Sequence, residues 1–172
     1  MNLKMAGVVA AAVGMGVAVH LAAAEREALA RRLRRQRERL RAAVLAVPGV
    51  ELTGHPKDRL PGLLSFVVRD ADGASIVIKL DLQGIAASVG SACTTGSTDP
   101  SHVLTAMGYP DDEARGAVRL SLGRATTDGE VDAAIEIVPR VLAEIRAGAA
   151  ALAADPLGQG VLTGGLTPTS PA

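Results

Sequence analysis

The stretch around which the predicted strands and helices are arranged is Gly90-Ser91-Ala92-Cys93-Thr94-Thr95-Gly96-Ser97, and it contains the only cysteine among 172 residues. Small and polar residues surround this cysteine. A structural cysteine behaves as a small hydrophobic side chain and would lie among Leu, Val or Ile. The surroundings therefore indicate a flexible, solvated loop, in which Cys93 is either a nucleophile or a free thiol without a role.

Downstream of this loop the sequence predicts a helix, a strand and a longer helix. Asp-Pro opens the first helix, over 99–107, with Asp as the N-cap and Pro at the first helical position. A strand is expected over 117–122. Thr127 and Glu130 have the spacing of a capping box, which predicts a final helix over 127–147.

Upstream of the loop, short apolar segments alternate with turn residues. They predict strands over 50–52, 63–68 and 85–88, and a helix over 74–82 that Gly84 ends. Strands that alternate with helices in this order predict an α/β (α+β) layer.

A long helix is expected before these elements. Residues 1–24 are almost entirely small and apolar, and residues 25–46 carry an amphipathic pattern. A signal peptide or membrane segment would also give an apolar start. However, the run contains little Leu, Ile or Phe, and no turn separates it from the charged segment, so a buried helix fits at least as well and membrane association is not favoured.

Composition limits the possible functions. The 18 basic and 18 acidic residues cancel, and Phe66 and Tyr109 are the only aromatic residues, so nucleic-acid binding is not expected. Eight arginines between Arg26 and Arg41 suit RNA, a membrane face or a solvated helix face, and the last is favoured. A single cysteine fits a reducing, cytoplasmic compartment, and the absence of a Cys/His cluster in the sequence argues against a structural metal site.

Several motifs follow one another in a recognisable order. They are Arg59-Leu60-Pro61, Leu80-Asp81-Leu82-Gln83-Gly84-Ile85, the cysteine loop, Pro100-Ser101-His102-Val103-Leu104, Ala106-Met107-Gly108, and Arg119-Leu120-Ser121-Leu122-Gly123-Arg124 with Thr126-Thr127. Together with residues 2–25, these stretches resemble the C-terminal part of the pyridoxal-phosphate (PLP)-dependent cysteine desulfurases. This group belongs to the class V aminotransferases, and the long-catalytic-loop branch that serves iron–sulfur cluster assembly matches best.

The resemblance implies the small C-terminal domain of the PLP-dependent transferase fold, preceded by a long helix. Residues 1–47 would form that helix, as a remnant of the large domain and the helix that connects it to the small domain. Residues 48–148 would form the small α/β domain with the catalytic-cysteine loop, and residues 149–172 a disordered tail.

The resemblance also assigns chemistry. Cys93 would take sulfur from L-cysteine as a persulfide, with release of alanine, for iron–sulfur cluster or thio-cofactor assembly. Arg119 would bind the substrate carboxylate, a role that suits the planar fork of a guanidinium. A sulfur-acceptor or scaffold protein is the partner that this chemistry implies.

One part of the family pattern is absent. The family holds PLP through a lysine in a Ser-x-His-Lys stretch, and neither Lys4, Lys57 nor Lys79 lies in such a stretch. We therefore assign no cofactor-binding residue in this chain and expect it to be truncated and inactive alone, with a possible large-domain partner chain. A stand-alone persulfide carrier and a non-enzymatic interaction module that uses the basic helix remain as alternatives.

Overall fold

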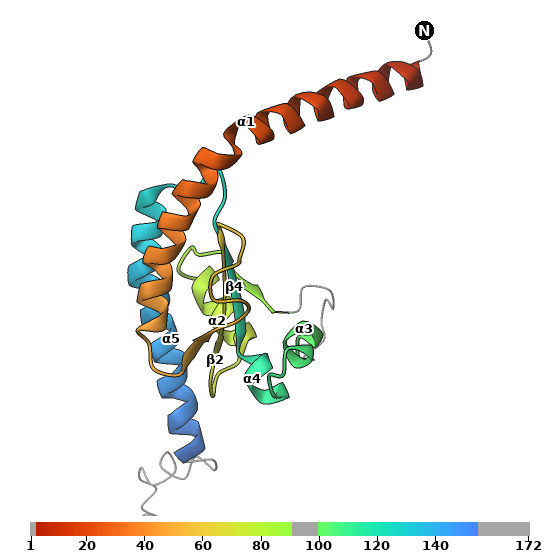
Figure 1. The fold of residues 1–172 in the computed structure, drawn as a ribbon. Coiled ribbons are helices and arrows are strands. Elements are labelled where there is room, and N and C mark those ends of the chain that lie inside the picture. The colour runs from red at the N-terminus through yellow and green to blue at the C-terminus, as the bar shows by residue number, and fades with distance from the viewer. Residues whose placement is uncertain (1–2, 91–99, 155–172) are drawn as a thin grey trace, which may run out of the picture.

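The structure is a computed structural model that describes residues 3–90 and 100–154. Its elements are α1 (Leu3–Leu45), β1 (Val50–Leu52), β2 (Leu63–Val68), α2 (Gly73–Asp81), β3 (Ser88–Val89), α3 (His102–Ala106), α4 (Asp111–Arg115), β4 (Ala117–Ser121) and α5 (Asp128–Ala154). Helices α1 and α5 lie side by side along the sheet (Figure 1). The predicted α/β (α+β) class and the long leading helix are confirmed.

The four strands form one antiparallel sheet in the order β1-β2-β4-β3. Strand β4 therefore lies inside the sheet, although it is the last strand in the sequence. The register places Arg119 of β4 opposite Ser65 of β2 on one side and opposite Ser88 of β3 on the other. Three segments that are far apart in the sequence thus meet at Arg119.

One face of the sheet carries the main hydrophobic core. Along β2, the alternate residues Leu64, Phe66 and Val68 are fully buried, as expected for a strand with one face on a core. The core residues that the helices contribute are Leu40 and Val44 of α1, Ile76 and Leu80 of α2, and Val138, Val141 and Leu142 of α5. Helices α1, α2 and α5 consequently cover this face.

Helix α1 is continuous, but its two halves differ. Residues 7–24 are exposed throughout, and this half projects away from the rest of the molecule (Figure 1). The expected burial of the apolar start is therefore not found among the described residues. The helix is long and apolar enough to cross a membrane, a test that soluble core helices and signal sequences also pass.

Two elements begin later than the sequence predicts. Strand β3 starts at Ser88 because Gly84, at φ +79, ends α2 and the N–H of Ile85 still donates to the carbonyl of Leu80 at 2.9 Å. Helix α3 starts at His102, after Ser101 as N-cap, so the prediction of Pro100 at the first helical position is wrong. Residue 99, the predicted N-cap, lies outside the described residues.

Helix ends account for the other differences. Thr127 and Glu130 form the predicted capping box: the N–H of Thr127 donates to Glu130 Oε2 at 2.7 Å, and the N–H of Glu130 donates to Thr127 Oγ1 at 3.2 Å. Helix α5 continues past the expected end at 147 to Ala154. The short helix α4 was not predicted, because a single turn has no periodic apolar pattern.

Candidate functional site

Cys93 and the rest of the segment 91–99 lie outside the described residues, but both ends of this segment are placed. A Cβ added to Gly90 would lie 2.8 Å from the Cβ of Ala117 and 3.4 Å from the Cβ of Ser101. Gly90 and Ser101, on either side of this segment, therefore lie beside the start of β4. Glycine is needed at position 90, because a side chain there would collide with that strand.

Arg119 lies on the opposite face of the sheet from the main core. Its neighbours Val118 and Leu120 are buried in that core, and side chains alternate along a strand. Arg119 is half-buried, and its side chain has no hydrogen bond or ion pair with any residue of the described ranges. Its guanidinium is therefore available for an anion from outside this set.

Hydroxyl side chains flank Arg119 across the sheet. Ser65 and Ser88 are its partners on the neighbouring strands. Beyond Ser65, the buried Thr53 donates through its N–H to the carbonyl of Ser65 at 3.0 Å, and its Oγ1 donates to Ser65 Oγ at 2.8 Å. We call Thr53, Ser65, Arg119 and Ser88 the polar row; it begins at the residue after β1 and crosses β2, β4 and β3.

Two short helices close one end of the face that carries the polar row. Val67 and Ala117, which alternate with Ser65 and Arg119 along their strands, pack in a second small core with Leu104 of α3 and Ala114 of α4. Helix α3 directly follows the segment that contains Cys93. The structure thus places Arg119 on this face of the sheet, whereas Cys93 lies outside the described residues.

The sequence analysis did not single out Thr53, Ser65 or Ser88. A hydroxyl residue between two buried apolar residues, as Ser65 is between Leu64 and Phe66, indicates only that one face is less apolar. The row depends on the register between strands, and no local pattern in the sequence contains that register.

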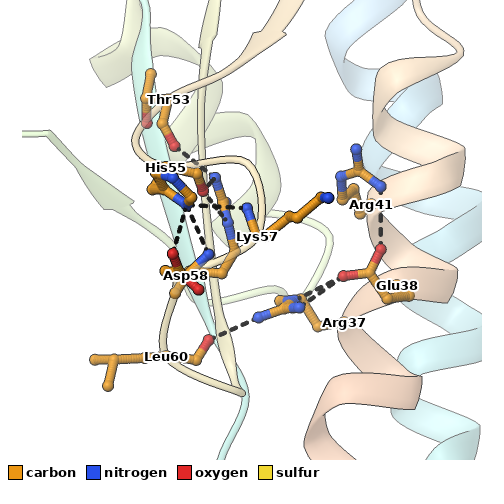
Figure 2. Close-up of polar contacts among 9 residues, drawn as sticks. Arg37, Glu38, Arg41, Thr53, His55, Lys57, Asp58 and Leu60 are labelled. Carbon is orange, nitrogen blue, oxygen red and sulfur yellow. Dashed lines mark hydrogen bonds and ion pairs between the residues drawn. The ribbon is translucent and has the colours of Figure 1, made fainter.

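Two arginines hold the loop before β2 and, with it, one end of the polar row (Figure 2). Arg59 donates through Nε to the carbonyl of His55 at 2.9 Å and through Nη2 to the carbonyl of Thr53 at 3.0 Å. Arg37 of α1 donates through Nη1 to the carbonyl of Leu60 at 2.8 Å. The motif Arg59-Leu60-Pro61 therefore has a structural role in shaping this loop.

Arg124 joins the end of β4 to the long helix. Its Nη2 donates to Glu25 Oε1 at 2.8 Å, and its carbonyl accepts a hydrogen bond from Arg32 Nη2 at 2.6 Å. These contacts give Arg124 a structural role.

The described lysines do not fit a PLP site next to Arg119. Lys79 lies on α2, on the helical side of the sheet, and its Nζ pairs with Glu144 Oε2 at 2.8 Å. Lys57 lies in the loop between β1 and β2, and its side chain extends toward Arg41 of α1 (Figure 2). Lys4 is in α1, and its side chain is not described. No described lysine is therefore placed to hold an aldehyde cofactor at the polar row.

Metal chemistry has no visible support in the part of the chain that the structure describes. Within residues 3–90 and 100–154, no group of three or more His, Cys, Asp or Glu side chains is arranged to hold an ion.

The fold and this face of the sheet define a class of protein. The chain belongs to the aminotransferase class-V family, whose sequence model matches residues 6–134. This agrees with the resemblance that the motifs indicate.

The similar proteins are named cysteine desulfurases. The chain is 42% identical over 134 residues to cysteine desulfurase IscS of Methanosarcina thermophila, covering 78% of this chain and 33% of that protein. It is 46% identical over 147 residues to the IscS-like cysteine desulfurase of Mycobacterium tuberculosis, covering 84% and 37% respectively. The X-ray structure of a NifS-like protein from Rickettsia africae matches with a TM-score of 0.65 at 26% identity, covering 74% of this chain and 33% of that one. The chain spans about a third of the length of these relatives.

Proposed function

We propose that this chain is the sulfur-accepting domain of a cysteine desulfurase, in which Arg119 binds the carboxylate of L-cysteine and Cys93 takes up the sulfur. The observation that carries this proposal is Arg119 itself. Its guanidinium lies in the middle of the polar row without a partner among the described residues, on the strand beside which both ends of the Cys93 segment attach. The names of the relatives support the substrate class.

The surroundings of Arg119 suit a carboxylate. A planar guanidinium can donate two parallel hydrogen bonds to the two oxygens of a carboxylate, which fixes the orientation of the bound molecule as well as its position. The adjacent residues Ser65 and Ser88 carry hydroxyl groups that can donate to the same oxygens. A lysine in place of Arg119 would supply the charge but not this planar geometry.

The net sulfur transfer balances without an external oxidant. The bond between Cβ and sulfur in L-cysteine breaks, and a sulfur–sulfur bond to Cys93 forms. The carbon takes a proton and leaves as the methyl group of alanine, so reduction of the carbon offsets oxidation of the sulfur. A thiolate at Cys93 is the reactive form for this transfer.

PLP would have to be held by residues other than the described ones, since the described lysines do not fit it. The relatives are about three times as long as the matched region, and a longer chain or a partner chain would supply the cofactor site. We accordingly propose that sulfur transfer requires this additional part, and that an acceptor protein then takes the sulfur from Cys93.

A chimera tests this function. The matched region of the Mycobacterium tuberculosis relative would be replaced by this chain, and sulfide release from L-cysteine measured with a reductant. We expect an active chimera, no activity with Cys93→Ala, and a KM for L-cysteine raised at least about tenfold by Arg119→Gln, the usual scale for a lost charged hydrogen bond. Ser121→Ala, an exposed change on the same strand, is the control.

Two results would reject parts of the proposal. A folded, PLP-loaded chimera without activity would show that this chain does not serve as the desulfurase domain. An unchanged KM in Arg119→Gln would remove Arg119 from substrate binding and leave Cys93 in place. The chain alone, mixed with PLP and L-cysteine, should release no sulfide.

The lack of a fit to PLP keeps a second function in view, namely a stand-alone persulfide carrier. Such a carrier needs Cys93 but has no need of Arg119. Mass spectrometry of the chain after incubation with a polysulfide donor would detect the gain of one sulfur atom on Cys93. If Cys93 takes up sulfur while the chimera stays inactive, the carrier is the better description.

We propose a cytoplasmic location for this activity, because a thiol that accepts sulfur must stay reduced between cycles. Cell fractionation of the tagged chain tests this, and recovery in the membrane fraction after a high-salt wash would contradict it.

A further inference from the structure

The second half of α1 has an unusual charge distribution. Residues 25–41 carry eight arginines and three glutamates, a net charge of +5, while the rest of the chain carries the opposite charge of −5. A neutral protein with this separation presents one basic region on a mildly acidic body. The question is which of these arginines the fold already uses.

Several arginines of α1 are used in packing against the body. Arg39 pairs with Asp132 of α5, and Arg32 donates to the carbonyl of Arg124. Arg37 is only 7% exposed and is held by Glu38 and by the carbonyl of Leu60. The cations that the body of the protein does not already bind are therefore the ones available to a partner.

Three cations lie on the side of α1 next to the loop before β2, with Arg34 and Lys57 exposed and Arg41 half-buried. Arg34 and Arg41 are two helical turns apart, so they lie on one face of α1, and Lys57 extends from the loop toward Arg41 (Figure 2). The side chains of Arg34 and Lys57 have no hydrogen bond or ion pair with the described residues. We call Arg34, Arg41 and Lys57 the basic face.

The single negative charge of Glu38 does not neutralise the positive charge of this region. It accepts from Arg37 at 2.7 Å and from Arg41 at 3.0 Å, so one carboxylate serves two arginines. The Nε of Arg41 is buried and has no partner among the described residues. In keeping with an excess of positive charge, burial and the charges of Arg37 and Arg41 lower the pKa of nearby Arg59.

We propose that the basic face is a docking site for a short acidic segment of a partner protein. Arg34 and Arg41 are about 10 Å apart along the helix, which about three extended residues span. An acidic segment of this length would bring carboxylates to the guanidinium groups of Arg34 and Arg41 and to the ammonium group of Lys57.

A long polyanion fits less well. Beyond the basic face, the rest of the chain is net negative and would repel a nucleic acid that extended past it. The two aromatic residues of the sequence provide no platform for stacked bases. The basic face includes neither Cys93 nor Arg119, so a loss of peptide binding can be told apart from a loss of sulfur transfer.

Fluorescence anisotropy of the full chain with a labelled hexaglutamate peptide tests the proposal, with a hexaglutamine peptide as the neutral control. Lys57→Glu and Arg34→Glu are suitable variants, because neither side chain supports the fold. We expect each to weaken hexaglutamate binding by about fivefold or more, as is usual for loss of a complementary charge. Arg140→Glu makes the same charge change on α5, where Arg140 contacts Gln83, and serves as the matched control.

The result expected is selective loss in Lys57→Glu and Arg34→Glu, with Arg140→Glu within about twofold of the parent chain. An equal loss in Arg140→Glu would mean that overall charge, and no defined face, attracts the peptide, and would overturn the proposal. Tighter binding of an oligothymidylate of matched charge, with the same dependence on Lys57 and Arg34, would overturn it in favour of a nucleic acid. Circular dichroism of each variant confirms that the fold is retained.

Discussion

The two halves of helix α1 have the same backbone conformation and opposite surroundings. In residues 25–45, Leu33, Leu40 and Val44 recur near the helical period and are buried, while most of the arginines lie outside this stripe. In residues 7–24 the side chains are exposed, Val13 to 62%, and this half of the helix projects away from the rest of the molecule (Figure 1). Both halves are helical, whereas an apolar stripe is needed to dock a helix against the body.

The comparison also explains why apolar content alone is a poor guide to burial. In a helix that is apolar on all sides, no single face packs preferentially against the core of its own chain. Such helices are usually enclosed by other protein or by lipid. The charged half docks because its few apolar residues are aligned. Hydrophobic pattern, more than hydrophobicity, thus decides which half belongs to the described core.

The largest expected difference between the two halves of α1 is the loss of stability when a large side chain is shortened. Leu40→Ala removes a side chain that is 1% exposed and should lower the free energy of unfolding by about 2–5 kcal/mol. Val13→Ala, in the other half, should change it by less than about 0.5 kcal/mol. Urea unfolding followed by circular dichroism measures both, and a comparable loss in Val13→Ala would show that residues 7–24 are packed in solution.

Glycines extend the same comparison to the backbone. A Cβ added at Gly116 would lie 2.1 Å from the carbonyl oxygen of Val68, so Gly116→Ala should destabilise the chain by about 1–3 kcal/mol. Gly14 has nothing within 4 Å, and Gly14→Ala should increase helix content, because Ala is favoured over Gly by about 1 kcal/mol in a helix. Thermal unfolding and far-UV circular dichroism test the pair; a loss of helix in Gly14→Ala would contradict a free-standing helix half.

These contrasts show what the sequence can and cannot predict. The strand over 63–68 was predicted with its correct bounds, because Leu64, Phe66 and Val68 and the flanking Pro-Gly turn are local signals. The capping box at Thr127 is local as well. The start of β3 at Ser88 depends on where the chain meets β4, which is a property of the assembled sheet.

The residues of the candidate site likewise fall into those that local motifs predicted and those that they did not. Cys93 and Arg119 were assigned from motifs, and the structure places Arg119 on the open face of the sheet while Cys93 stays outside the described residues. The hydroxyl neighbours of Arg119 were missed, since Ser65 and Ser88 become its neighbours only through strand pairing. Strand pairing decides which residues become neighbours across the sheet, and no local stretch of the sequence reveals that pairing.

The exposed half of α1 should control association of the chain. A variant with Val9→Lys, Val13→Lys and Val17→Lys places three charges on a surface that now exposes valine. Because burial of apolar surface drives association, we expect the parent chain to self-associate through this surface and the variant to do so at least about tenfold more weakly, with an unchanged unfolding midpoint. Sedimentation velocity measures the oligomeric state; matched lysines at Ala28, Ala42 and Ala43 on the docked half are the control, and equal dissociation there would assign association to the docked half.

The smallest expected effect concerns the charges of the docked half. Hydrogen bonds from Arg37 and then Arg41 hold the pKa of Glu38 below its ordinary value of 4.5. A carboxyl group whose pKa is lower in the folded state stabilises the fold above its unfolded pKa, and this contribution disappears as the pH falls through the lowered folded pKa. Glu38 is half exposed, so solvent reduces the size of the effect.

Glu38→Gln should therefore make the melting temperature fall less steeply, as the pH drops below about 4.5, than it does in the parent chain. Glu27→Gln, which removes an exposed carboxylate 3.9 Å from Arg31 in the same helix, should leave that slope unchanged. Differential scanning fluorimetry across this range compares the variants at constant ionic strength. A slope in Glu38→Gln that matches the parent would mean that the contacts of Glu38 with Arg37 and Arg41 do not persist in solution.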